Sequence, residues 1–217
     1  MHFMNYNRFI VSLSFYRERQ MKINKNKKLY SVFETYLITI QALRTMPQLQ
    51  RAKKKGDLDD SFIERIMLAV TEVNGCAICS YAHTKIALEA GLTDVEIKNM
   101  LSGLSADVPE NEIPAVLFSQ HYADTRGYPS KDTWQRIVEI YGLSAAKGIL
   151  GATRAIMMGN AYGIAWSSFF NRLRGKPDPR SGFLYEISMI FFGFLFFPFA
   201  IIHALLLNLF KVSLIHF

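Results

Sequence analysis

The sequence predicts an all-α protein with a long apolar helix near its C-terminus. Three observations predict this architecture. Apolar residues recur at intervals of three and four along most of the chain, capping signals stand where these patterns begin, and no segment shows the strict alternation of a half-buried strand. The length of 217 residues suits one domain plus an appendage, and a hydrophobic content of 50% allows a sizeable core.

The first 29 residues are expected to form an N-terminal extension outside the helical domain. A short apolar run at 9–16 is interrupted by two serines and has no small-residue cleavage site behind it, which argues against a secretory signal peptide. Met21 opens a lysine-rich stretch that looks like a conventional protein start. Our hypothesis is that translation begins at Met21.

Residues 30–174 are expected to form the helical domain. Its first helix is predicted over 30–46, where five apolar residues recur at helical spacing, and Pro47 is expected to end it. The basic run at 51–57 is interpreted as a solvated loop.

The second helix has a readable start and end. Ser61 and Glu64 fit a capping box, and apolar residues follow through Val73. The Asn74-Gly75 pair then favours a turn. The same signals, with Gly91 as a C-terminal stop and Ser130 and Ser144 as N-caps, predict further helices over 76–90, 93–101, 112–125, 131–141 and 145–174.

The chain ends in a linker at 175–182 and a membrane segment at 183–217. Residues 187–210 contain no Asp, Glu, Lys or Arg, and about 24 residues at about 1.5 Å each reach the ~30 Å of a bilayer core. We expect a transmembrane or firmly membrane-embedded helix, with a buried core helix as the alternative. Basic residues favour the cytoplasmic side of a membrane. Only Lys211 follows the segment closely, whereas four basic residues precede it, namely Arg172, Arg174, Lys176 and Arg180. A cytoplasmic domain on the cell membrane is therefore expected.

The formal net charge of +7 is compatible with an anionic partner. An anionic membrane surface fits this charge, given the apolar tail. Nucleic acid is not expected to be a partner, because the chain has no zinc-finger spacing or nucleic-acid motif and its aromatic residues do not interleave with the basic ones.

The stretch NGCAICSYAH, residues 74–83, contains the only two cysteines of the chain. At about 100° per residue, Cys76, Cys79 and His83 fall within roughly 60° on one helix face. A helix N-terminus and a nearby imidazole both favour a thiolate, so this spacing indicates redox chemistry. Two alternatives stay open: an inert buried pair, and a metal site. The metal site would need a fourth ligand such as Glu64, Glu72 or His121.

The longer stretch EVNGCAICSYAHTKIALEAGLTDVEI resembles the AhpD-like alkylhydroperoxidase family, within the wider carboxymuconolactone decarboxylase fold. The resemblance is strong over 58–104 and weaker to about residue 165, and it implies an AhpD-like helical bundle. By resemblance, Cys76 is the resolving cysteine, Cys79 the peroxidatic one, and Glu64 and His83 complete the catalytic set. Well-studied members have a histidine directly before the second cysteine, where this chain has Ile78. One member of their proton relay is therefore missing.

The resemblance implies a thiol-dependent peroxidase that reduces hydroperoxides through a Cys76–Cys79 disulfide. An external dithiol protein would restore the pair, with no cofactor and no metal, and the family's assemblies imply a homo-oligomer, a trimer or hexamer. Two alternatives remain. One is a membrane-tethered thiol–disulfide oxidoreductase or redox sensor, which Ile78 favours slightly, and the other is a non-catalytic membrane-anchored binding module. Glu64 has two candidate roles, catalytic group and helix cap, which do not exclude each other.

The start at Met21 is tested by mass spectrometry of the N-terminus of the native protein. We expect the first peptide to begin at Met21 or at the residue after it. Detection of a peptide that contains Phe9 would contradict the hypothesis.

Overall fold

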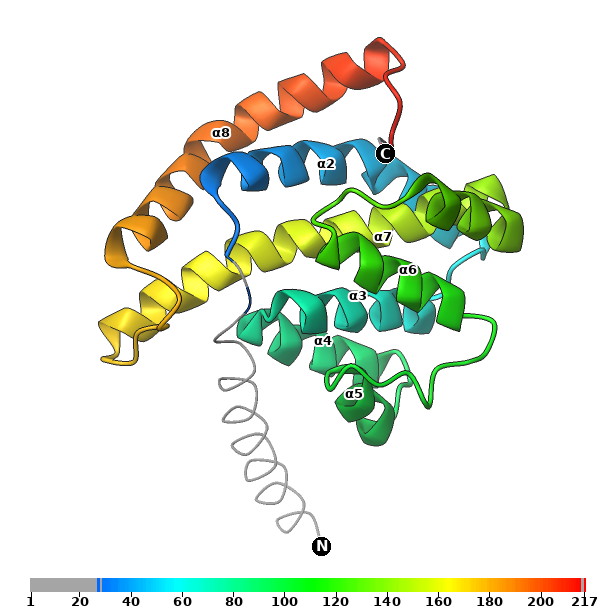
Figure 1. The fold of residues 1–217 in the computed structure, drawn as a ribbon, viewed down its shortest axis with the longest axis horizontal. Coiled ribbons are helices and arrows are strands. Elements are labelled where there is room, and N and C mark those ends of the chain that lie inside the picture. Colours follow the sequence, from blue (N-terminus) through cyan, green and yellow to red (C-terminus); the bar gives the residue numbers. More distant parts are fainter. Residues whose placement is uncertain (1–26, 28, 216) are drawn as a thin grey trace, which may run out of the picture.

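A computed structural model describes residue 27, residues 29–215 and residue 217 of the chain. In this part of the chain every regular element is an α-helix, and the helices, α2 to α8, form one bundle (Figure 1), which confirms the all-α prediction. The proposed start at Met21 lies outside the described residues, as does most of the expected N-terminal extension.

Helix α2 (Val32–Lys55) is longer than the sequence predicts. Ser31 caps it through a capping box with Glu34, and the helix runs through Pro47 to end at Gly56, whose φ is 76°. The expected end at Pro47 and the expected loop at 51–57 are therefore wrong. The physical reason is tertiary: α2 packs along α7, where Ala52 is buried, and this packing outweighs the one backbone hydrogen bond that a proline removes.

Helix α3 (Asp60–Asn74) begins with a different cap from the expected one. The carboxylate of Asp59 accepts a hydrogen bond from the Phe62 N–H at 2.7 Å. The Ser61 hydroxyl donates to Asp59 and accepts from Arg65, and it does not cap the helix. The capping box of Ser61 with Glu64 is therefore wrong, and the Glu64 carboxylate is free for another partner. The end of the helix is as predicted, because Gly75 adopts a left-handed φ of 68°.

Three shorter helices confirm the predicted pattern: α4 (Ala77–Glu89), α5 (Asp94–Met100) and α6 (Ile113–Asp124). A buried ion cluster joins α3 to the α5 and α6 region. The Arg65 guanidinium donates to Glu96 at 2.6 Å and to both carboxylate oxygens of Glu112 at 3.0 and 3.1 Å. Burial raises the pKa of Glu112 despite this pairing. The cluster fixes the register of these helices.

The segment α7 (Lys131–Leu173) contains the break that the sequence predicts between two helices. Ser130 caps its start as expected, and the backbone leaves the helical conformation at Gly142, with φ 74° and ψ 158°. Ser144 lies two residues after this break, and its hydroxyl donates to Asp57 at 3.0 Å. Further along, a Cβ at Gly151 would lie 2.8 Å from the Thr45 carbonyl oxygen of α2, so a residue without a side chain is needed there.

Helix α8 (Phe183–Leu209) lies along the outside of α2 and also contacts α7 (Figure 1). Ala200 and Ala204 bury one of its faces against Ile40. The helix is long and apolar enough to cross a membrane, and only 11% of its most apolar window is buried. The alternative of a buried core helix, which the sequence allows, is therefore excluded.

The cap assignment of α3 is tested with Asp59→Ala and Ser61→Ala as a matched pair. We expect Asp59→Ala to lower the free energy of unfolding by about 1 kcal/mol at pH 7. Ser61→Ala should lower it by about 0.5 kcal/mol or less. Denaturant unfolding of both variants measures this.

The pH dependence gives an internal control for the same pair. The Phe62 N–H is the main cause that holds the pKa of Asp59 below its ordinary value of 3.8. A lowered carboxylate pKa stabilises the fold above the unfolded value and loses that contribution as the pH falls. The effect of Asp59→Ala should therefore shrink below about pH 4. A larger loss from Ser61→Ala than from Asp59→Ala would contradict the assignment.

Candidate active site

The two cysteines meet at the N-terminus of α4. Cys76 is the N-cap residue and is fully buried, and its sulfur accepts a hydrogen bond from the Cys79 N–H at 3.3 Å. The two residues form a disulfide, with their Cα atoms 5.3 Å apart. The Cys79 side chain is the more accessible of the two at 8% exposure. A reagent that approaches the pair therefore reaches Cys79 first.

Glu64 and His83 form the second half of the site. Oε2 of Glu64, on α3, lies 2.8 Å from Nδ1 of His83, on α4, and the carboxylate is almost fully buried. A carboxylate can only accept, so the Nδ1–H donates and the lone pair of the ring is on Nε2. His83 follows Cys79 by one helical turn, so both side chains lie on the same face of α4.

Helix α7 closes the site through two glycines that the sequence analysis missed. The Cys79 sulfur lies 3.6 Å from the Gly159 carbonyl oxygen. A Cβ at Gly163 would lie 2.8 Å from the Cys79 sulfur and 2.9 Å from the Cys76 sulfur. Position 163 must therefore be glycine for α7 to contact the disulfide. The available signal was a pair of glycines four residues apart inside a helix, where glycine is otherwise unfavourable.

Buried polar side chains surround the backbone next to the cysteines. The Tyr30 hydroxyl donates to Asn74 Oδ1 at 2.5 Å, and burial raises the pKa of Tyr30 to about 12. The Thr71 hydroxyl donates to Asn160 Oδ1 at 3.2 Å. Among the described residues, the Nδ2 groups of Asn74 and Asn160 have no hydrogen-bond partner. Two amide donors close in sequence to Cys76 and Gly159 therefore remain available to a water molecule or ligand.

Ile78 stands between the cysteines at the rim of the site. It is half exposed, and its Cγ2 would lie 3.2 Å from a Cβ at Gly163. Tyr81, also exposed, follows it on the same helix. These two described side chains therefore place no imidazole on this part of the rim.

The residues named as possible further metal ligands do not complete a site. The part of the chain that the structure describes holds no group of three or more His, Cys, Asp and Glu side chains close enough to bind a metal ion. Glu72 pairs instead with Lys27 at 3.0 Å, and His121 lies on α6. The described side chains give the metal alternative no support.

Comparison with known families gives one match. Residues 41–116 match the model of the Carboxymuconolactone decarboxylase family, and this range contains Glu64, Cys76, Cys79 and His83. The resemblance predicted from the sequence is confirmed over this stretch. No curated protein and no solved structure matches the chain.

The contact between α7 and the disulfide is tested with Gly163→Ala and Gly159→Ala. A Cβ at Gly159 would meet only Ile156, at 3.8 Å, so this variant should be as stable as the parent or up to about 1 kcal/mol more stable. Gly163→Ala should be about 1–3 kcal/mol less stable than Gly159→Ala, because its methyl group overlaps both sulfurs.

Two measurements report the effect of this pair of variants. Denaturant unfolding gives the stability of the oxidised proteins, and the rate of reduction by dithiothreitol gives the accessibility of the disulfide. We expect faster reduction in Gly163→Ala. Equal stability and equal reduction rates in the two variants would show that α7 does not contact the pair.

Proposed function

We propose that this protein is a thiol-dependent peroxidase that reduces hydroperoxides through a Cys76–Cys79 disulfide cycle. The observation that carries the proposal is the geometry of α4. A cysteine pair able to form a disulfide stands at its N-terminus, and an imidazole oriented by a buried carboxylate follows one turn later. The family match adds support, since the matched stretch includes all four residues.

The first step forms the nucleophile. In the reduced protein, Nε2 of His83 takes the proton of the Cys79 thiol, and the Glu64 carboxylate stabilises the resulting imidazolium through Nδ1–H. The N–H groups of the first turn of α4 add positive potential at the same place. The reactive sulfur is thus a thiolate in a largely buried setting.

The second step consumes the peroxide. The Cys79 thiolate attacks the O–O bond, so that sulfur is oxidised to a sulfenic acid and the peroxide is reduced to an alcohol. The alkoxide leaving group takes its proton from the His83 imidazolium. The Cys76 thiol then attacks the sulfenic sulfur, which forms the disulfide and releases water.

The third step restores the dithiol. A dithiol reductant protein attacks the disulfide, and two exchange steps leave the partner oxidised and both cysteines reduced. Cys79 is the more exposed of the two cysteine residues, so the mixed disulfide should form there. Helix α8 would hold this activity at the cytoplasmic face of a membrane.

One observation favours a second candidate function. The exposed Ile78 leaves the rim of the site apolar where a relay histidine would serve peroxide cleavage. A thiol–disulfide oxidoreductase or redox sensor needs no such relay, because the leaving group is a thiolate. In this function the same cysteine pair exchanges with protein disulfides and does not consume peroxide.

The assignment of Cys79 is tested by peroxide consumption with dithiothreitol as the reductant. We expect Cys79→Ser to lose turnover by roughly a thousandfold or more, because the nucleophile is absent. Cys76→Ser, once reduced and then freed of dithiothreitol, should still react once and leave a sulfenic acid on Cys79 that dimedone traps. Equal peroxide consumption by the parent and Cys79→Ser would contradict the proposal.

The same proteins separate the two candidate functions. The oxidoreductase is favoured if the parent protein reduces a small disulfide quickly but reduces cumene hydroperoxide no faster than Cys79→Ser does. Faster reaction with the hydroperoxide favours the peroxidase.

A further inference from the structure

The polar side chains of α8 face the protein and are paired there. Glu186 is fully buried, and its carboxylate accepts hydrogen bonds from Arg172 at 2.7 and 2.9 Å and from Ser181 at 2.6 Å. In the middle of the helix, Nδ1 of His203 lies 3.2 Å from the Tyr36 hydroxyl of α2. These contacts hold the first and central parts of α8 on the helical bundle.

The C-terminal end of α8 is held by one buried arginine of α2. The Arg44 guanidinium donates to Asn208 Oδ1 at 3.0 Å and to the carbonyl oxygens of Val212 and Ser213 at 2.5 and 3.1 Å. The helix also packs closely, since a Cβ at Gly193 would lie 2.8 Å from the Tyr162 ring. Helix α8 is therefore attached to the bundle along its whole length.

These contacts disfavour an α8 that leaves the bundle to cross a bilayer. Separation would leave Glu186, His203 and Asn208 without these partners in or near hydrocarbon, where polar and ionisable side chains are costly. If α8 crossed the bilayer while still packed on α2, α2 would also enter the lipid. Helix α2 carries Glu34 in its first turn and three lysines in its last turn.

The opposite face of α8 is apolar and open. Six of its strongly exposed residues are Leu184, Phe191, Phe194, Ile202, Leu205 and Leu209. At about 100° per residue these six fall within roughly 80° of arc, and the equally exposed Phe199 lies about 60° beyond it. Glu186, Gly193 and Ala204 lie on the opposite side. A helix of 27 residues is about 40 Å long. We call this stripe of six residues the outer face of α8.

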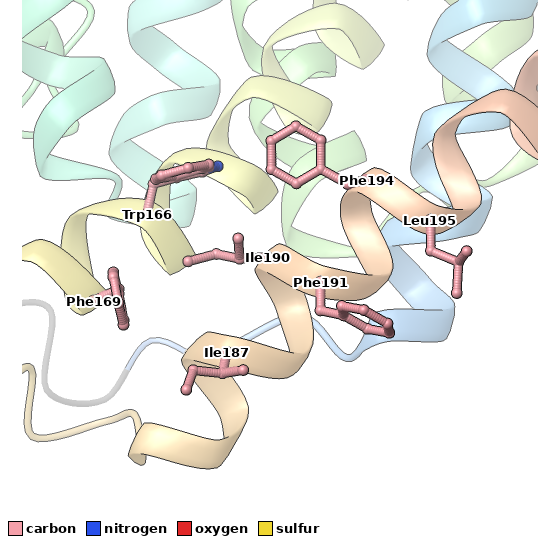
Figure 2. Close-up of a pocket in the computed structure, with 7 residues that line it drawn as sticks. All are labelled: Trp166, Phe169, Ile187, Ile190, Phe191, Phe194 and Leu195. Atoms are coloured by element: carbon pink, nitrogen blue, oxygen red, sulfur yellow. The ribbon is translucent and has the colours of Figure 1, made fainter.

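A groove widens this apolar surface towards α7. It has a volume of about 630 Å³ and lies between Trp166 and Phe169 of α7 and five apolar side chains of α8 (Figure 2). Trp166 stands three residues after Gly163, which contacts the disulfide, and thus about 4.5 Å further along the helix axis. The apolar surface therefore begins about one helical turn from the redox site.

Charge distinguishes a lipid surface from a second copy of the chain. Arg174 and Lys176 are exposed before the outer face and Lys211 is exposed after it, whereas the one acidic residue of α8, Glu186, is buried. Two copies paired through this face would bring basic ends together in either orientation. Anionic lipid headgroups instead attract basic residues that lie near the surface.

We propose that α8 binds an anionic lipid bilayer in the plane of the interface, with its outer face in the acyl region, while it stays packed on α2 and α7. The inference rests on the membrane association proposed above, and it is independent of the thiol chemistry. In this arrangement the redox site and the α7–α8 groove lie beside the lipid. Helices that lie in the interface bury their apolar face about 5–10 Å into the boundary region.

The depth of α8 in vesicles tests the inference. Single cysteines replace Leu184, Phe194 and Leu205 in a Cys76→Ser/Cys79→Ser protein and are labelled with an environment-sensitive fluorophore. A cysteine at Lys85, an exposed position on α4, is the matched control. In phosphatidylcholine–phosphatidylglycerol vesicles we expect similar, shallow quenching depths at the three α8 positions and none at Lys85. A label at Phe194 that is much deeper than the other two would overturn the proposal.

Protease access gives a second test, on protein that keeps both native cysteines. Protein with a tag after Phe217 is added to preformed vesicles and treated with protease. We expect removal of the tag, because both ends of α8 stay on the outer side, and a protected tag would overturn the in-plane arrangement.

Protein that fails to float with vesicles and forms a stable dimer would overturn both this inference and the membrane association. That outcome leaves the peroxidase proposal standing, since peroxide consumption by the parent and Cys79→Ser is measured without lipid.

Discussion

The contact between Glu64 and His83 is the interaction on which the rest of the site depends. A buried carboxylate is costly unless it is paired, and His83 is its partner at 2.8 Å. The pairing ties α4 to α3, fixes the imidazole tautomer, and directs the free nitrogen of the ring away from the carboxylate. Because Asp59 caps α3, Glu64 is not needed at the helix start. The Asp59 cap thus leaves the Glu64 carboxylate to pair with His83.

The second constraint is that two positions of α7 that contact other segments must be glycine. Gly163 lets the helix contact both sulfurs, and Gly151 lets the same helix contact the backbone of α2. Helix α2 in turn carries Arg44 and Tyr36, which hold α8. The redox site and the apolar outer face are therefore two ends of one packed unit. A membrane-bound peroxidase or oxidoreductase with this geometry would meet substrates that partition into lipid.

Local signals in the sequence predicted much of this structure. The glycine at residue 75 and the Ser130 cap are features of neighbouring residues, and both predictions are confirmed. The cysteine spacing brings the two sulfurs together in a disulfide. The error at Pro47 has a tertiary cause, because packing along α7 carries α2 across a residue that favours a break. The break that the sequence predicts after residue 141 is present at Gly142. The contact of Gly163 with the disulfide joins segments more than 80 residues apart, so spacing alone could not reveal it.

The central claim is that the Glu64–His83 pair makes Cys79 reactive. Its most direct test is the rate at which a hydroperoxide re-forms the Cys76–Cys79 disulfide in fully reduced protein, measured in the parent and in Glu64→Gln. The account predicts a rate about 10²-fold slower in Glu64→Gln, with the fold intact, because the imidazolium loses its stabilising charge. Equal rates in the two proteins would contradict it.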